Sequence, residues 1–116
     1  MKDFLLLFRG TDVSPEFSPE QIQAQMQKWM DWVNGLVQDK KYKGGNPLFD
    51  TGKTISGTKK VLTDGPFMEG KEMLGGYILV PAKDYDEAVA IASNCPILDG
   101  ETGSVEVREV RPVESY

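Results

Sequence analysis

Two short segments that are apolar at every position constrain the fold of this chain most strongly. They are residues 4–8, Phe-Leu-Leu-Leu-Phe, and residues 77–80, Tyr-Ile-Leu-Val. Arg9-Gly10 ends the first segment and Pro81 ends the second. A strand with one face in water alternates apolar and polar residues, so an unbroken apolar run of this length indicates a β-strand that is buried on both faces.

A helix is predicted after the first apolar strand. Ser18-Pro19-Glu20-Gln21 is typical of a helix start, with Ser18 as the N-cap, proline at the first helical position and Gln21 placed to reach back to the cap. The helix is expected to end near residues 38–41. Its buried stripe, at spacings of three and four residues, consists of Ile22, Met26, Trp29, Val33 and Leu36.

Shorter segments predict the remaining strands. Residues 43–49 are predicted as a glycine-broken strand or a loop. Residues 54–56 are predicted as a short strand, and residues 60–63 as a more clearly marked strand. Residues 104–108 alternate apolar and polar side chains, which is typical of a half-exposed strand. Gly75-Gly76, which opens the second apolar strand, indicates a β-bulge or a close approach of another backbone segment.

The order of these elements predicts one α+β domain over residues 1–116. Asp84, with Glu87 three residues later, opens a second helix, and Pro96 ends it because the residue before a proline resists helical geometry. The order strand, helix, two or three strands, helix, strand is a ferredoxin-like βαββαβ pattern. In that pattern both helices cover one face of an antiparallel sheet.

This pattern leaves one face of the sheet uncovered. The two helices cover the other face, yet the strands at residues 4–8 and 77–80 are apolar on both sides. Leaving about five large side chains in water would forfeit roughly 1.5–3 kcal/mol for each of them. We therefore expect a homodimer in which two sheets pack face to face into a dimeric α+β barrel. The alternative is that the rest of the chain folds back over this face.

Composition excludes several classes of function. A net charge of −5 argues against nucleic-acid binding, which depends on Lys and Arg. The basic cluster at Lys40, Lys41 and Lys43 is interpreted as the solvated end of the first helix. The chain has no histidine and one cysteine, which excludes Ser-His-Asp catalysis, zinc sites built from imidazole or thiolate ligands, and an internal disulfide. Carboxylates could bind Mg²⁺ or Ca²⁺, but their spacing matches no EF-hand loop, so we expect no metal and no cofactor.

The same data predict a cytoplasmic protein with no membrane partner. The longest apolar run is far shorter than the roughly 20 residues that a membrane span needs. The start at Met1-Lys2-Asp3 is not a basic region followed by a long apolar segment, so no signal peptide is expected.

Other prominent side chains are interpreted as packing residues. Trp29 and Trp32 are assigned to the core and the interface rather than to a stacking platform, and Met26 and Met30 suit packing around them. Cys95 precedes a proline at a helix end and has no basic neighbour in sequence, so it is interpreted as structural.

The candidate catalytic residue is Asp64, which closes a predicted strand before a Gly-Pro turn. Leu62, Phe67 and Tyr77 lie near it in sequence and could give it an apolar setting. A carboxylate in such a setting can act as a general base. The alternative is that Asp64 accepts hydrogen bonds from amides of the turn, as aspartate often does before glycine.

Four further charged residues are candidates for binding. Lys71 lies between Glu69 and Glu72 and could hold an anionic group of a substrate or tune Asp64, whereas a surface salt-bridge network is the alternative, favoured for Glu72. Arg9, at the end of the first strand, could bind a carboxylate in the same pocket, or it could be a rim residue.

Residues 63–77, with Asp64-Gly65-Pro66-Phe67 at their centre, resemble the signature of the YCII-related (DGPF-type) proteins. A second piece, residues 92–96 followed by residues 103–108, resembles the ending of that family, although Glu109-Val110 intervenes before Arg111-Pro112-Val113. The resemblance implies a dimeric α+β barrel of ferredoxin-like protomers. Its relatives include small isomerases, decarboxylases and monooxygenases, whose pocket lies between helix-side loops and the sheet.

The resemblance also bears on the site. A better-studied branch of the family is thought to use a His–Asp pair, and this chain has no histidine, so only the aspartate position, Asp64, carries over. The DGPF branch is often associated with extracytoplasmic-function sigma factors.

Two functions follow as hypotheses. The first is a small acid–base enzyme, in which Asp64 moves a proton on a small carbonyl or lactone-type substrate while Lys71 or Arg9 binds its anionic end. The second is a non-enzymatic dimer that binds a small ligand or a protein partner, such as a sigma factor, in transcriptional regulation.

Overall fold

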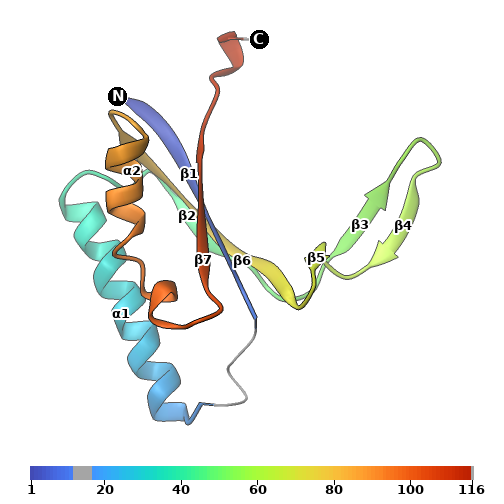
Figure 1. Cartoon of the computed structure of the whole chain (residues 1–116), viewed down its shortest axis with the longest axis horizontal. Coiled ribbons are helices and arrows are strands. Elements are labelled where there is room, and N and C mark those ends of the chain that lie inside the picture. Colours follow the sequence, from blue (N-terminus) through green and yellow to red (C-terminus); the bar gives the residue numbers. More distant parts are fainter. Residues whose placement is uncertain (12–16, 116) are drawn as a thin grey trace.

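A computed structural model of the chain describes residues 1–11 and 17–115. Its main sheet is antiparallel, with the strand order β2-β6-β1-β7, and the two-residue strand β5 pairs with β6 beyond this path (Figure 1). The elements are β1 (Lys2–Gly10), α1 (Pro19–Gln38), β2 (Gly45–Pro47), β5 (Met68–Glu69), β6 (Glu72–Ala82), α2 (Tyr85–Ala92) and β7 (Ser104–Glu109). Two short 3₁₀ helices, Pro96–Asp99 and Val113–Ser115, flank β7 in sequence. Core strands β1, β2, β6 and β7 with helices α1 and α2 confirm the ferredoxin-like α+β prediction.

The first helix begins as its sequence predicts. Ser18 accepts a hydrogen bond from the Gln21 backbone N–H at 3.2 Å, and the Gln21 side chain accepts one from the Ser18 N–H at 2.8 Å. This reciprocal capping box satisfies two backbone donors that a helix start would otherwise leave unpaired. Asp84 caps α2 in the predicted place by accepting from the Glu87 N–H at 2.9 Å.

The two apolar strands have two different faces. On β1, Phe4, Leu6 and Phe8 are buried and pack in one core with Leu36 of α1 and with α2. The residues between them point to the opposite face and are half-buried. There Leu5 lies opposite Leu79, and Leu7 opposite Tyr77, across the β1–β6 ladder. The prediction that both strands are apolar on both sides is confirmed, and the face away from the helices is called the open face below.

The glycine pair of β6 serves both predicted purposes. The β1–β6 register shifts between Phe8 and Arg9, so that Phe8 lies opposite Gly76 and Arg9 opposite Leu74, which leaves Gly75 as the extra residue of a β-bulge. A Cβ atom on Gly76 would lie 3.1 Å from the Asn46 carbonyl oxygen of β2. The close approach of β2 therefore depends on glycine at position 76.

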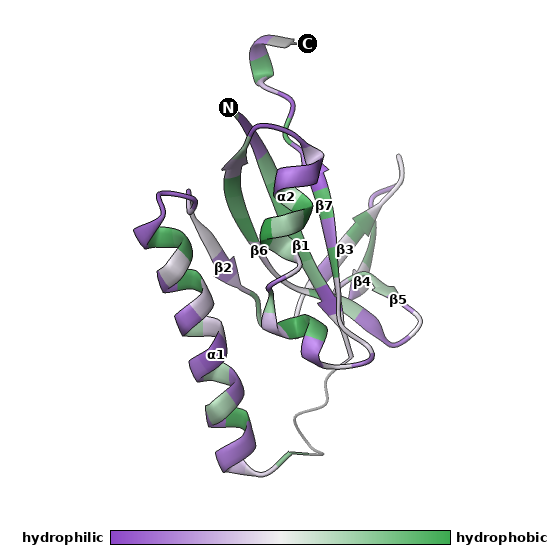
Figure 2. Ribbon diagram, turned by 60° about the vertical axis from the view of Figure 1, so that its left-hand side comes forward, coloured by the Kyte–Doolittle hydropathy of each residue, from purple (hydrophilic) through white to green (hydrophobic). Residues whose placement is uncertain are grey.

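The strands predicted at residues 54–56 and 60–63 exist, but they do not join the main sheet. They form a separate two-stranded sheet, β3 (Lys53–Ser56) and β4 (Val61–Asp64). We call residues 53–64 the arm. The strand that completes the main sheet is instead β2, in the segment predicted as a strand or a loop. The arm extends on the side of the sheet away from α1 and α2 (Figures 1 and 2).

Candidate functional site

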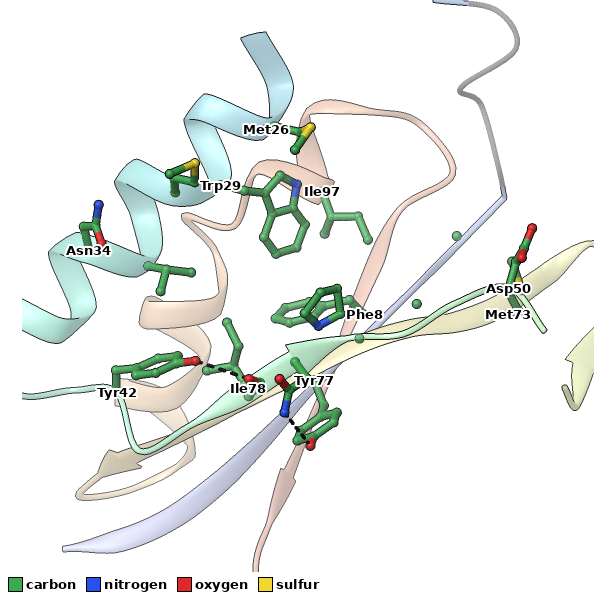
Figure 3. A pocket seen from close by; sticks show the side chains of 18 of the residues that line it. Phe8, Met26, Trp29, Asn34, Tyr42, Asp50, Met73, Tyr77, Ile78 and Ile97 are labelled. Atoms are coloured by element: carbon green, nitrogen blue, oxygen red, sulfur yellow. Dashed lines mark hydrogen bonds between the residues drawn. The ribbon is translucent and has the colours of Figure 1, made fainter. Parts of the chain in front are cut away.

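A cavity of about 800 Å³ lies between α1 and the strands β2 and β6 (Figure 3). Small-molecule sites in proteins typically have about 300–1,000 Å³ and mainly apolar walls. This cavity fits that description. Its principal apolar lining consists of Phe8, Met26, Trp29, Val33, Ile78 and Ile97.

The cavity lies beside the part of α1 that precedes Leu36, where Trp29 reaches Phe8 of the sheet and the methionines do not. Of the predicted stripe of α1, only Leu36, near the end of the helix, is buried. Met26 and Met30 are 59% and 56% exposed, and both line the cavity. The interpretation of the two methionines as packing residues is therefore wrong, because the sheet surface that they would pack on lies across the cavity.

Aromatic rings form the inner wall. Phe8 and Trp29 meet edge to face with their centroids 5.1 Å apart, and Trp29 meets Trp32 in the same way at 5.8 Å. Such pairs contribute about 0.5–1.5 kcal/mol beyond the area they bury, so this wall is well fixed. Both tryptophans pack against the core, as predicted, but Trp29 also lines the cavity, a role that the periodicity of the helix did not indicate.

A few polar groups interrupt the apolar lining. The Tyr42 hydroxyl donates to the Gly45 carbonyl at 3.4 Å on the cavity side. Asn46 donates to the Tyr77 hydroxyl at 3.2 Å on the open face, where the side chain of Tyr77 lies (Figure 3). Asn34 lies on α1 and Asp50 lies far from it, beyond the end of β2 (Figure 3). The sequence did not predict Asn34, Tyr42, Asn46 or Asp50 as site residues, since none of them belongs to a motif. The one available signal was Asn34, which continues the 26–30–34 row on the cavity side of α1.

Asp64 lies on the arm and not in the cavity. Its side chain is 87% exposed and forms an ion pair with Lys53, its cross-strand neighbour, at 2.6 Å from Nζ to Oδ1. Leu62 and Phe67 are themselves 58% and 78% exposed, so they do not shield this carboxylate within one chain. Asp64 pairs with Lys53 rather than with amides of the turn. It lines a shallow depression with Asp50, and Asp50 also lines the large cavity.

Arg9 lies on the open face of the sheet. Its neighbours Phe8 and Gly10 line the cavity, and the alternation of side chains along β1 sends Arg9 the other way. Its guanidinium donates to Glu106 of β7, which also accepts from Arg108 at 3.2 Å. Hydrogen bonds from Arg108 and Arg9 hold the pKa of the Glu106 carboxyl below its ordinary value.

Glu69, Lys71 and Glu72 surround the tight turn between β5 and β6. Gly70 has a φ of +64°, and Glu69 lies directly opposite Glu72. Like charges in that position destabilise a β-ladder. Among the described residues no ion pair involves these three side chains, so the alternative of a local salt-bridge network is not formed here. None of the three lines the cavity.

Three further expectations can be compared with the described residues. Cys95 is 2% exposed, and burial raises the pKa of its thiol to about 11, which confirms a structural role. Within residues 1–11 and 17–115, no group of three or more His, Cys, Asp or Glu side chains is arranged to hold a metal ion. No described helix is both long enough and apolar enough to span a bilayer.

The fold and the cavity define a ferredoxin-like α+β protein with room for a small molecule between its first helix and its sheet. The chain belongs to the YCII-related domain family, whose sequence pattern matches residues 4–114. This confirms the resemblance seen in the sequence.

Two known proteins are similar to this chain, one in part of its sequence and one in its fold. A 53-residue segment is 40% identical to an uncharacterized protein of Rhizobium meliloti (strain 1021) and covers 46% of this chain and 43% of that protein. The match thus spans less than half the length of this relative. The structure of 5-chloro-2-hydroxyhydroquinone dehydrochlorinase (TftG) from Burkholderia phenoliruptrix AC1100, in complex with 2,5-dihydroxybenzoquinone, is similar over 97% of both chains, with a TM-score of 0.52 and 16% identity. At that identity the likeness shows the fold alone.

Proposed function

We propose that this protein binds a small aromatic molecule in the cavity between α1 and the sheet. The observation that carries the proposal is the cavity itself, with a volume of about 800 Å³ and an apolar, aromatic wall interrupted by a few polar groups. The structural neighbour TftG, which shares the fold, was solved with 2,5-dihydroxybenzoquinone. That compound and a panel of hydroxybenzoates are therefore suitable first probes.

A matched pair of valines on α1 tests the location of binding. Val33 lines the cavity, whereas Val37 is 51% exposed and does not. Val33→Phe should project a ring into the cavity and weaken binding of the best probe at least about tenfold, while Val37→Phe should leave the affinity unchanged. Calorimetric titration measures both, with the thermal unfolding of each variant as a check on folding. Equal affinities in the two variants would place the ligand elsewhere.

We further propose carboxylate-based acid–base chemistry on the bound molecule, with Asp64, which lies outside the cavity of its own chain, as the proton-transferring group. Asp50 supports the assignment, because it lines both the cavity and the depression that contains Asp64. Lys71 and Arg9 remain candidates for binding an anionic group of the substrate, and Glu69 and Glu72 remain candidate binding residues on either side of Lys71. All four lie outside the cavity of their own chain. Turnover of carbonyl, lactone and hydroquinone-type substrates should be lost in Asp64→Asn. It should persist in Asp31→Asn, where the changed carboxylate lies on the exposed surface of α1.

The working form in this proposal is a cytoplasmic homodimer joined through the open faces. Support comes from Leu5, Leu7, Tyr77 and Leu79, which stay half-buried on a face that lies away from both helices. The single buried cysteine agrees with a reducing compartment. Light scattering of the purified protein should give the mass of two chains, and Leu7→Lys should give the mass of one.

A non-enzymatic role is the second candidate. The observation that favours it is the exposure of Asp64, whose partner in the described residues is a lysine on the same arm. In this role the dimer binds a protein such as a sigma factor, as the family resemblance suggests. Co-purification with that partner, unchanged by Asp64→Asn and accompanied by no turnover of the substrate panel, would favour this function over the enzymatic one.

A further inference from the structure

The arm is the part of this molecule that packs least against the rest. Every residue of the arm except Thr54 is exposed. The radius of gyration of the chain is 15.9 Å, whereas a compact chain of this length would have about 13 Å. An isolated two-stranded hairpin is only marginally stable in water. The arm therefore lacks, within its own chain, the packing that such hairpins need.

One solvent-exposed face of the arm carries apolar side chains. Ile55 and Leu62 lie opposite each other across the two strands and are 69% and 58% exposed. Side chains two residues apart share a face of a strand, so the next pair on this face is Lys53 with Asp64. The candidate carboxylate thus lies directly beside the apolar pair. Exposed apolar patches of this kind mark interaction surfaces.

The net charge of the arm and the side of the sheet to which it extends indicate what covers the arm. The arm carries Lys53, Lys59 and Lys60 against one aspartate, whereas the whole chain has a net charge of −5. The remainder of the chain is therefore strongly acidic and attracts the arm of another copy. The arm also extends on the side of the open face (Figure 1). Two copies related by a two-fold axis would cover both open faces and both arms at once.

We propose that the arm clasps a second copy of this chain, burying Ile55 and Leu62 against the partner and carrying the Lys53–Asp64 pair into the interface. The inference rests on the homodimer put forward above and adds to it a second contact, in which the surroundings of Asp64 are incomplete until the partner supplies them. This second contact accounts for the exposure of the candidate catalytic carboxylate, Asp64, in a single chain.

The test compares two faces of the same arm. The double variant Ile55→Asp/Leu62→Asp places charges on the apolar face, and Val61→Asp places one on the opposite face at a site that is 57% exposed. Sedimentation equilibrium should show a dimer dissociation constant at least about thirtyfold higher for the double variant, because each change occurs twice in a symmetric dimer. Val61→Asp should stay within about threefold of the unaltered protein.

The outcomes separate this inference from the dimer on which it rests. A monomeric unaltered protein would overturn both. A dimer that Leu7→Lys dissociates and that Ile55→Asp/Leu62→Asp leaves intact would overturn the clasp alone. A photo-crosslinker at position 55 gives a second readout on purified protein: a covalent dimer supports the clasp, and crosslinks only within one chain contradict it.

Discussion

Glu106 illustrates how single side chains on the open face respond to pH. It lies on β7 opposite Leu7 of β1, and two guanidinium groups, those of Arg9 and Arg108, donate hydrogen bonds to its carboxylate. The pKa of Glu106 is therefore lower in the folded chain than in the unfolded one. Its contribution to stability is present above the ordinary pKa of a glutamate and is lost as the pH falls through the lower, folded value.

We accordingly expect Glu106→Gln to lower the thermal stability at pH 7 and to have a steadily smaller effect as the pH falls from the ordinary pKa of about 4.3 toward pH 3. Melting temperatures of both proteins across this range measure the difference. A difference that is the same at both ends would contradict the assigned pairing.

Cys95 should be inert in the folded protein. It is 2% exposed, and its raised pKa of about 11 keeps it protonated at neutral pH. Because the thiolate is the reactive form, dithiobis(nitrobenzoate) should not label the native protein on a timescale of minutes and should label it fully in denaturant. Rapid labelling of the native chain would show that the helix end around Cys95 opens readily.

At the scale of elements, local sequence signals set where helices begin and how strands approach each other. The capping box at Ser18 is formed by four consecutive residues and needs no tertiary contact. The glycine pair of β6 acts over a longer distance, because Gly76 lets β2, about 30 residues earlier, approach the sheet.

Removing the cap should weaken α1 by a predictable amount. Ser18→Ala is expected to lower the free energy of unfolding by about 1 kcal/mol, because the Gln21 N–H loses its acceptor. Denaturant unfolding measures the change. Ser56→Ala, an exposed position at the end of β3, is the control and should change stability by less than about 0.5 kcal/mol.

The two adjacent glycines should respond differently to the same substitution. A Cβ on Gly76 would meet the β2 backbone at 3.1 Å, whereas on Gly75 the first contact is the Phe8 carbonyl oxygen at 3.9 Å. Gly76→Ala should therefore displace β2 and cost about 1–3 kcal/mol, and Gly75→Ala should cost less. Equal losses would mean that β2 does not limit the space at this position.

In the whole molecule, the two faces of the sheet have different surroundings. The helices cover one face and leave the cavity beside α1, while the open face and the arm lie on the other side (Figure 2). A dimer joined through these surfaces is more stable at higher protein concentration, because association stabilises the folded state by mass action.

The melting temperature should therefore rise with protein concentration over about a hundredfold range. In Leu7→Lys it should be lower and independent of concentration, because the charge would lie in the centre of the proposed interface. Calorimetric scans at several concentrations measure both proteins. A melting temperature of the unaltered protein that does not change with concentration would contradict self-association in this range.

The sequence by itself determined what depends on near neighbours and on periodicity. The double-faced apolar strands, both helix starts, the glycine bulge and the family signature could all be predicted, because each depends on side chains a few residues apart. These features were sufficient for the ferredoxin-like class.

Only the tertiary structure decided which residues share a site. Arg9 and Phe8 are neighbours in sequence, yet they lie on opposite faces of β1, so only Phe8 lines the cavity. The strand that ends in Asp64 was predicted, but its pairing with β3 outside the main sheet places that carboxylate on an exposed arm. Which face of β1 lies toward the cavity and which strand pairs with β4 depend on contacts between distant segments, and patterns along one segment do not encode them.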